Sequence, residues 1–148
     1  MPTASLSASI DINAKPETVF AYVSDLTEHA EWSANPLKVE ALSANPIGVG
    51  SAYRSSATVR NLTFTAELRV TEYQAPTRFG FSGQDSTGKF SHRFTLTPIN
   101  SGTQVTRQIN FTLSFRQWLR FWILYFPVRK PAAHKALHLL KQQLEKSQ

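Results

Sequence analysis

The sequence contains no cysteine, which excludes disulfide bonds, thiolate metal ligands and cysteine nucleophiles. A chain without cysteine fits a reducing compartment. Long hydrophobic runs are also missing: the most apolar stretch, residues 118–128, is interrupted by Arg120 and is about half the roughly 20 residues that span a bilayer. The first twelve residues lack the basic and apolar regions of a secretory signal. These absences predict a soluble, cytoplasmic protein.

Motifs that carry well-defined chemistry are missing as well. The sequence has no phosphate-binding P-loop, no G-x-S-x-G nucleophile context and no evident pair of catalytic carboxylates. His134 and His138 have the spacing of two metal ligands on a helix, but no third ligand accompanies them, so we expect a solvated face and no metal. We therefore assign no cofactor and no catalytic residue.

The positive charge is concentrated at the C-terminal end. Residues 116–148 contain seven basic side chains and one acidic side chain, which accounts for the whole net charge of +6. No recognisable nucleic-acid-reading module accompanies this charge, so we expect no nucleic-acid partner.

The same segment begins with an aromatic cluster, made up of Trp118, Phe121, Trp122, Tyr125 and Phe126. A helix that is apolar nearly all round is typical of a core or of the roof of a cavity. Aromatic rings flanked by Arg116, Arg129 and Lys130 also suit transient contact with an anionic membrane surface. Both interpretations stay open at this point.

The first part of the chain predicts a strand and two short helices. Hydrophobic residues alternate over residues 6–12, which indicates a strand with one buried face. Pro16 suits the first turn of a helix. Asp25 followed by Glu28 resembles a capping box that opens a second short helix, which ends near Trp32.

The rest of the chain predicts a run of strands and then a helical end. Period-two patterns and turn residues delimit strands at residues 37–42, 49–59, 62–73, 78–82, 89–98 and 103–115. Pro127 and Pro131 predict a short aromatic helix over 117–126, a kink, and a regular helix from Pro131. Strands and helices that are segregated in this way indicate an α+β fold.

Several segments in this order resemble the START-like, or SRPBCC, superfamily, in its polyketide cyclase/dehydrase-like branch. The resemblance rests on residues 10–20, 23–32, 48–54, 76–79 and 102–106, and it covers the whole chain as a single domain, 1–148. It implies a helix-grip (Bet v 1-like) fold, in which a curled antiparallel sheet wraps around a long C-terminal helix. It also implies a cavity for lipids, polyketides or other hydrophobic molecules. Family helices of this kind are commonly continuous, so Pro127 and Pro131 are a departure.

His92 is in phase with Phe90, Phe94 and Leu96, so alternation places it on the apolar face of the sheet. It is a candidate polar anchor or acid–base group in the cavity. Alternatively, it is a core histidine that is hydrogen-bonded to the backbone or to a neighbouring strand.

Arg107 shares the parity of Val105, Ile109 and Phe111. An arginine on an inward face needs a partner, because burying a lone charge is costly. Arg107 would hold a ligand carboxylate or phenolate, or it would pair with an internal acid. Alternatively, it would lie at the solvent-exposed end of its strand.

These patterns predict non-covalent binding of a small hydrophobic ligand, with an enzyme of the cyclase/aromatase or dehydratase type as the alternative. In that alternative His92 is the general base, and Arg107 or a tyrosine stabilises an enolate. The predicted ligand-binding residues are Trp32, Tyr53, Phe64, Phe81, His92, Phe94, Arg107, Phe111, Trp122 and Phe126.

Overall fold

The computed structural model describes residues 3–44, 46–59, 61–85, 88–112, 114, 116, 119 and 126–146, and it gives no side-chain detail at 59 and 126–130. The chain forms one long strand, two short helices, six further strands and a C-terminal helix. In order they are β1 (Thr3–Ile12), α1 (Pro16–Val23), η1 (Leu26–Glu31), β2 (Leu37–Ala41), β3 (Ala52–Val59), β4 (Leu62–Gln74), β5 (Arg78–Asp85), β6 (Gly88–Ile99), β7 (Gly102–Thr112) and α3 (Phe126–Lys146).

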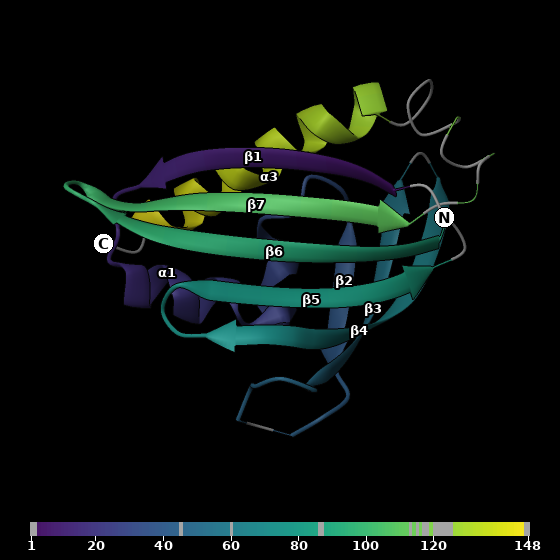
Figure 1. Ribbon diagram of the computed structural model, residues 1–148, viewed down its shortest axis with the longest axis horizontal. Helices are drawn as coiled ribbons and strands as arrows, with labels where there is room; N and C mark the ends of the chain where they lie inside the picture. The colour runs from purple at the N-terminus through teal and green to yellow at the C-terminus, as the bar shows by residue number, and fades with distance from the viewer. Residues whose placement is uncertain are drawn as a thin grey trace.

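The seven strands form one antiparallel sheet in the order β1-β7-β6-β5-β4-β3-β2. Figure 1 shows the sheet curling so that β2 and β3 turn away from the plane of β4 to β7, with α1 and α3 on the concave side. The predicted α+β helix-grip fold is confirmed.

The two short helices begin as their sequences predict. Pro16 occupies the first turn of α1, where a missing N–H costs nothing. Asp25 caps η1 by accepting a hydrogen bond from the backbone N–H of Thr27 over 3.1 Å. η1 is a 3₁₀ helix, and Trp32 follows it directly. The sharp end of this helix turns the indole into the core, where it is 1% exposed.

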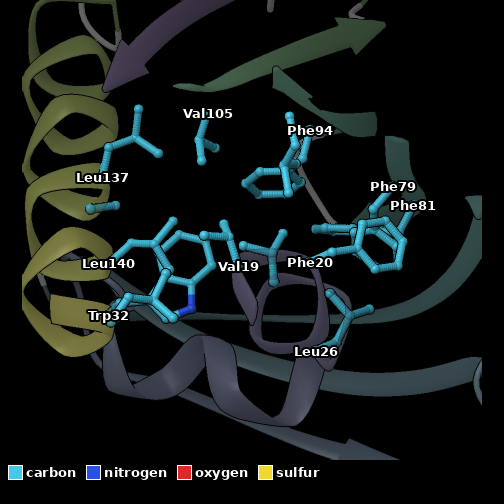
Figure 2. Packing of buried hydrophobic residues seen from close by; sticks show 14 of the residues in the cluster. Val19, Phe20, Leu26, Trp32, Phe79, Phe81, Phe94, Val105, Leu137 and Leu140 are labelled. Carbon is cyan, nitrogen blue, oxygen red and sulfur yellow. The ribbon is translucent and has the colours of Figure 1, made fainter. Parts of the chain in front are cut away.

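The core lies between the concave face of the sheet and the helices. Leu137 and Leu140 of α3 point toward Trp32 and Val19, with Phe94 opposite them on the sheet (Figure 2). The predicted leucine stripe is confirmed: Ala133, Leu137, Leu140 and Leu144 are all buried, together with Ala136. α3 makes most of its contacts with β1 and some with η1.

Several element boundaries differ from the prediction, among them the starts of β1 and β3 and the end of β7, and two further differences have a clear physical reason. α3 begins at Phe126 rather than at Pro131, and Pro131 lies inside it. Pro127 stands in the first turn, where no backbone donor is required, and Pro131 removes only one intrahelical bond.

β5 extends to Asp85 instead of ending at residue 82. A glycine normally weakens a strand. At Gly83 the strand continues because Leu68 and Phe90 fill the space above it: a Cβ there would lie 2.6 Å from Leu68 Cδ2. Neighbouring side chains therefore do the packing that the glycine itself cannot do.

The aromatic helix predicted over 117–126 falls almost entirely outside the described residues, so the predicted membrane contact of this segment stays a prediction. Within the part of the chain that the structure describes, no helix is both long and apolar enough to cross a membrane.

Candidate ligand-binding site

The register of the sheet places a polar pair on the concave face, on the adjacent strands β7 and β6. Arg107 on β7 lies opposite Phe94 on β6 and Ala8 on β1, whereas His92 lies opposite Ile109 on β7. Arg107 and His92 are thus diagonal neighbours on adjacent strands, a separation that long side chains can bridge. Both side chains are on the inner face, as alternation predicts, and both are partly exposed.

The guanidinium of Arg107 is held by one hydrogen bond and two aromatic rings. Nη2 donates to Nδ1 of His92 over 2.9 Å. The guanidinium carbon lies 5.4 Å from the ring centroid of Trp32 and 5.4 Å from that of Phe94, a separation typical of cation–π contacts. Because arginine can only donate, Nδ1 of His92 accepts and carries no proton.

Burial lowers the pKa of Arg107 to about 10, so the side chain still carries its charge at neutral pH. Its Nε is fully buried, and no described residue accepts a hydrogen bond from it. The indole Nε1 of Trp32 is a second buried donor without a partner among the described residues. Buried donors without a partner are rare in folded proteins, so these two donors call for an explanation.

His29 belongs to the same group, although the sequence patterns did not single it out. Its Nε2 donates to the carbonyl of Val23 over 2.8 Å, and its ring centroid lies 4.4 Å from that of Trp32. Burial, with the nearby charge of Arg107, lowers the pKa of His29 to about 3 against the opposing effect of the Val23 bond. His29 is therefore neutral. Its position three residues before Trp32 in the short helix is the signal that would have identified it.

Aromatic rings continue the site beyond His92. The imidazole stacks on Phe81 with a centroid distance of 4.7 Å and an interplanar angle of 15°. Phe90 meets the same imidazole edge-on at 5.6 Å. Phe90 is only half-buried, whereas Phe94 and Val105 on the other side of Arg107 are completely buried. The polar pair marks the boundary between a sealed core and a less covered part of the concave face.

The other predicted site residues are distributed over the molecule. Trp32, Tyr53, Phe81 and Phe94 belong to the main core cluster, and Phe111 belongs to a second cluster with Leu6 and Ile109. Phe64 is half-buried on β4. The side chains of Trp122 and Phe126 lie outside the described residues.

Tyr53 is buried in the core but borders a different surface. It lines an open depression of about 190 Å³ together with Asp25, Thr27 and Ser51. Burial and the charge of Asp25 raise the pKa of its hydroxyl. Tyr53 is not among the residues that contact the Arg107 guanidinium.

The predicted solvent-facing histidines of the C-terminal helix are exposed, at His134 and His138. Among the described residues, no group of three His, Cys, Asp or Glu side chains has the arrangement of a metal site.

Residues 3–145 match the family described as polyketide cyclase / dehydrase and lipid transport. The chain belongs to this family. Its description joins proteins that act on or carry hydrophobic molecules, and membership supports binding of a hydrophobic ligand in general. No curated protein matches the sequence.

Solved structures of low sequence identity share the fold. The structure of TTHA0849 from Thermus thermophilus has a TM-score of 0.81 at 16% identity, covering 97% of this chain and 99% of that one. Protein CV1439 from Chromobacterium violaceum has a TM-score of 0.73 at 16% identity, with 95% and 96% covered. Ara h 8.0201 has a TM-score of 0.70 at 12% identity, with 98% and 99% covered. At such identities the likeness concerns the fold alone.

Proposed function

We propose that this polyketide cyclase / dehydrase and lipid transport family member binds one small hydrophobic ligand non-covalently on the concave face of its sheet. The observation that carries the proposal is the Arg107–His92 pair, a hydrogen-bonded polar group inside a ring of aromatic side chains. Small-molecule sites commonly combine an apolar lining with a few polar groups that fix orientation.

The apolar lining of the proposed site is best supplied by side chains that are not already fully packed. Phe64 and Phe90 are half-buried on the inner face, so a ligand can remove further apolar area from water there. Burial stabilises a complex by roughly 25 cal/mol per Å² of apolar area. Phe81 and Phe94, which are 4% and 0% exposed, support the site from behind rather than line it.

Native mass spectrometry of the purified protein, followed by organic extraction, tests the proposal directly. We expect a one-to-one complex with an apolar molecule, or stoichiometric uptake of the neutral fluorescent probe N-phenyl-1-naphthylamine by the extracted protein. A protein that carries no ligand and takes up no probe would contradict the proposal.

Two variants on β4 test whether the probe binds at the proposed site. Phe64→Ala removes a half-buried inward ring and should weaken probe binding several-fold. Leu62→Ala, two residues earlier on the same strand, removes a side chain that is 62% exposed and should leave affinity unchanged. Equal losses in the two variants would place the probe elsewhere.

The enzymatic alternative is a cyclase or dehydratase that uses His92 as general base. Nδ1 of His92 already accepts from Arg107, so the neutral ring carries its proton on Nε2. Nε2 of that tautomer donates, so the geometry favours His92 as a hydrogen-bond donor over a general base. We therefore favour binding as the primary function.

A further inference from the structure

The largely buried charge of Arg107 has no counter-ion among the residues that the structure describes. All ten Asp and Glu side chains lie among the described residues, and none forms an ion pair with Arg107. The ion pairs of Arg54, Arg69 and Arg93 all involve arginines whose side chains are more than half exposed. No Asp or Glu occurs between Asp85 and Glu145, so the segment that leads into α3 cannot supply a side-chain carboxylate either.

The contacts that Arg107 does make hold its position without neutralising its charge. His92 offers one lone pair, and the rings of Trp32 and Phe94 offer their faces. Cation–π contacts offset part of the desolvation of a buried guanidinium, but an ionic partner offsets far more. The buried Nε–H has no acceptor among the described residues. Arg107 is therefore a cation that is held in place and can still donate hydrogen bonds to a ligand.

The charge of the site determines which anion fits it. His29 is neutral because burial and Arg107 keep its pKa near 3, and Nδ1 of His92 is unprotonated because it accepts from Arg107. Of the described side chains in this group, Arg107 alone therefore presents a positive charge to the ligand. A single carboxylate balances that charge, whereas a doubly charged phosphate would leave a net negative charge in an aromatic surrounding. Guanidinium and carboxylate groups also match in planar, two-point geometry.

We propose that the ligand is an amphiphilic monoanion, a hydrophobic body that ends in one carboxylate, and that Arg107 is its counter-ion. The carboxylate accepts from Nε and from the remaining N–H groups of the guanidinium, while the hydrophobic body extends past His92 along Phe90 and Phe64. His92 is a positioning residue that orients the guanidinium. This inference rests on the proposed binding of a hydrophobic ligand and specifies its chemical class.

The test compares two probes that differ only in the head group, dodecanoate and dodecanol, each displacing N-phenyl-1-naphthylamine from the unaltered protein. We expect dodecanoate to bind roughly 10- to 100-fold more tightly than dodecanol, which is the range for a hydrogen bond to a charged group. Arg107→Gln should abolish this preference and still bind the neutral probe. The preference should persist between about 50 mM and about 500 mM salt, because salt screens buried pairs weakly.

Arg69→Gln is the matched control, because it removes one positive charge from the exposed outer face of β4. It should keep the full preference for dodecanoate. Equal binding of acid and alcohol by the unaltered protein, or an equal loss in the Arg69 and Arg107 variants, would overturn the inference while leaving hydrophobic binding intact. Failure of the neutral probe to bind at all would instead contradict the proposed function.

Discussion

Nη2 of Arg107 donates to Nδ1 of His92 over 2.9 Å, across two adjacent strands on the concave face of the sheet. The bond joins the one side-chain acceptor that Arg107 has among the described residues to a ring that is itself stacked on Phe81. The stacked imidazole therefore holds the guanidinium in a fixed position.

Removing this acceptor should destabilise the protein. His92→Phe keeps an aromatic ring on Phe81 but leaves the Arg107 guanidinium without its hydrogen bond, which should lower the free energy of unfolding by about 1–3 kcal/mol. His92→Gln supplies an amide oxygen as acceptor and should recover part of the loss. Urea denaturation of the three proteins measures both effects, and a phenylalanine variant as stable as the parent would show that the bond contributes nothing.

Stability should fall in mild acid because of His29. The pKa of this imidazole is about 3 in the folded chain against 6.5 when unfolded, so the unfolded state binds the proton more strongly. The contribution of His29 to the free energy of unfolding is complete above about pH 6.5. As the pH falls toward 3, this contribution is lost at about 1 kcal/mol per pH unit.

His29→Gln keeps a donor for the Val23 carbonyl but cannot take up a proton, so its stability curve should be flatter between about pH 6 and pH 5. His134→Gln changes an exposed imidazole and should leave the slope as it is. Parallel curves for His29→Gln and the parent, measured by urea denaturation across this range, would remove His29 as the cause.

The packing of α3 against the sheet should depend on Leu140. This side chain is 0% exposed in the main core cluster, so Leu140→Ala should cost about 2–5 kcal/mol of unfolding free energy through lost contacts and a cavity. Lys135→Ala changes an exposed residue of the same helix and should stay within about 0.5 kcal/mol. Similar midpoints in thermal or urea unfolding would mean that the helix contributes little to the core.

The turn between β6 and β7 should tolerate only glycine at position 102. Gly102 has φ +149°, and a Cβ there would overlap the carbonyl oxygen of Ile12 and lie 2.8 Å from the nitrogen of Ala14. Gly102→Ala should therefore destabilise the protein by roughly 2–4 kcal/mol. Gly48→Ala is the comparison, because nothing lies within 4 Å of the added carbon. Circular dichroism melts of both variants would distinguish a specific clash at Gly102 from a general cost of replacing glycine.

Local patterns in the sequence were sufficient for the order of the elements and for the facing of most strand residues. Alternation along β6 and β7 placed His92 and Arg107 on the apolar face because the side-chain period of a strand is a local property. The leucine stripe of α3 was equally readable, since a helix repeats within a few residues. The start of α3 was misplaced because a proline is tolerated in a first turn and its exclusion from helices is only a tendency.

The sequence by itself determined that an arginine and a histidine share the parity of the apolar residues on their strands, and that the second half of the chain is almost free of acids. Only the tertiary structure decided that Arg107 meets His92, Trp32 and Phe94 and none of the ten acidic side chains. It also brought His29 to the same place from a short helix far away in the chain. These encounters depend on strand register and on the curl of the sheet, which arise from pairings between distant segments and leave no local signature.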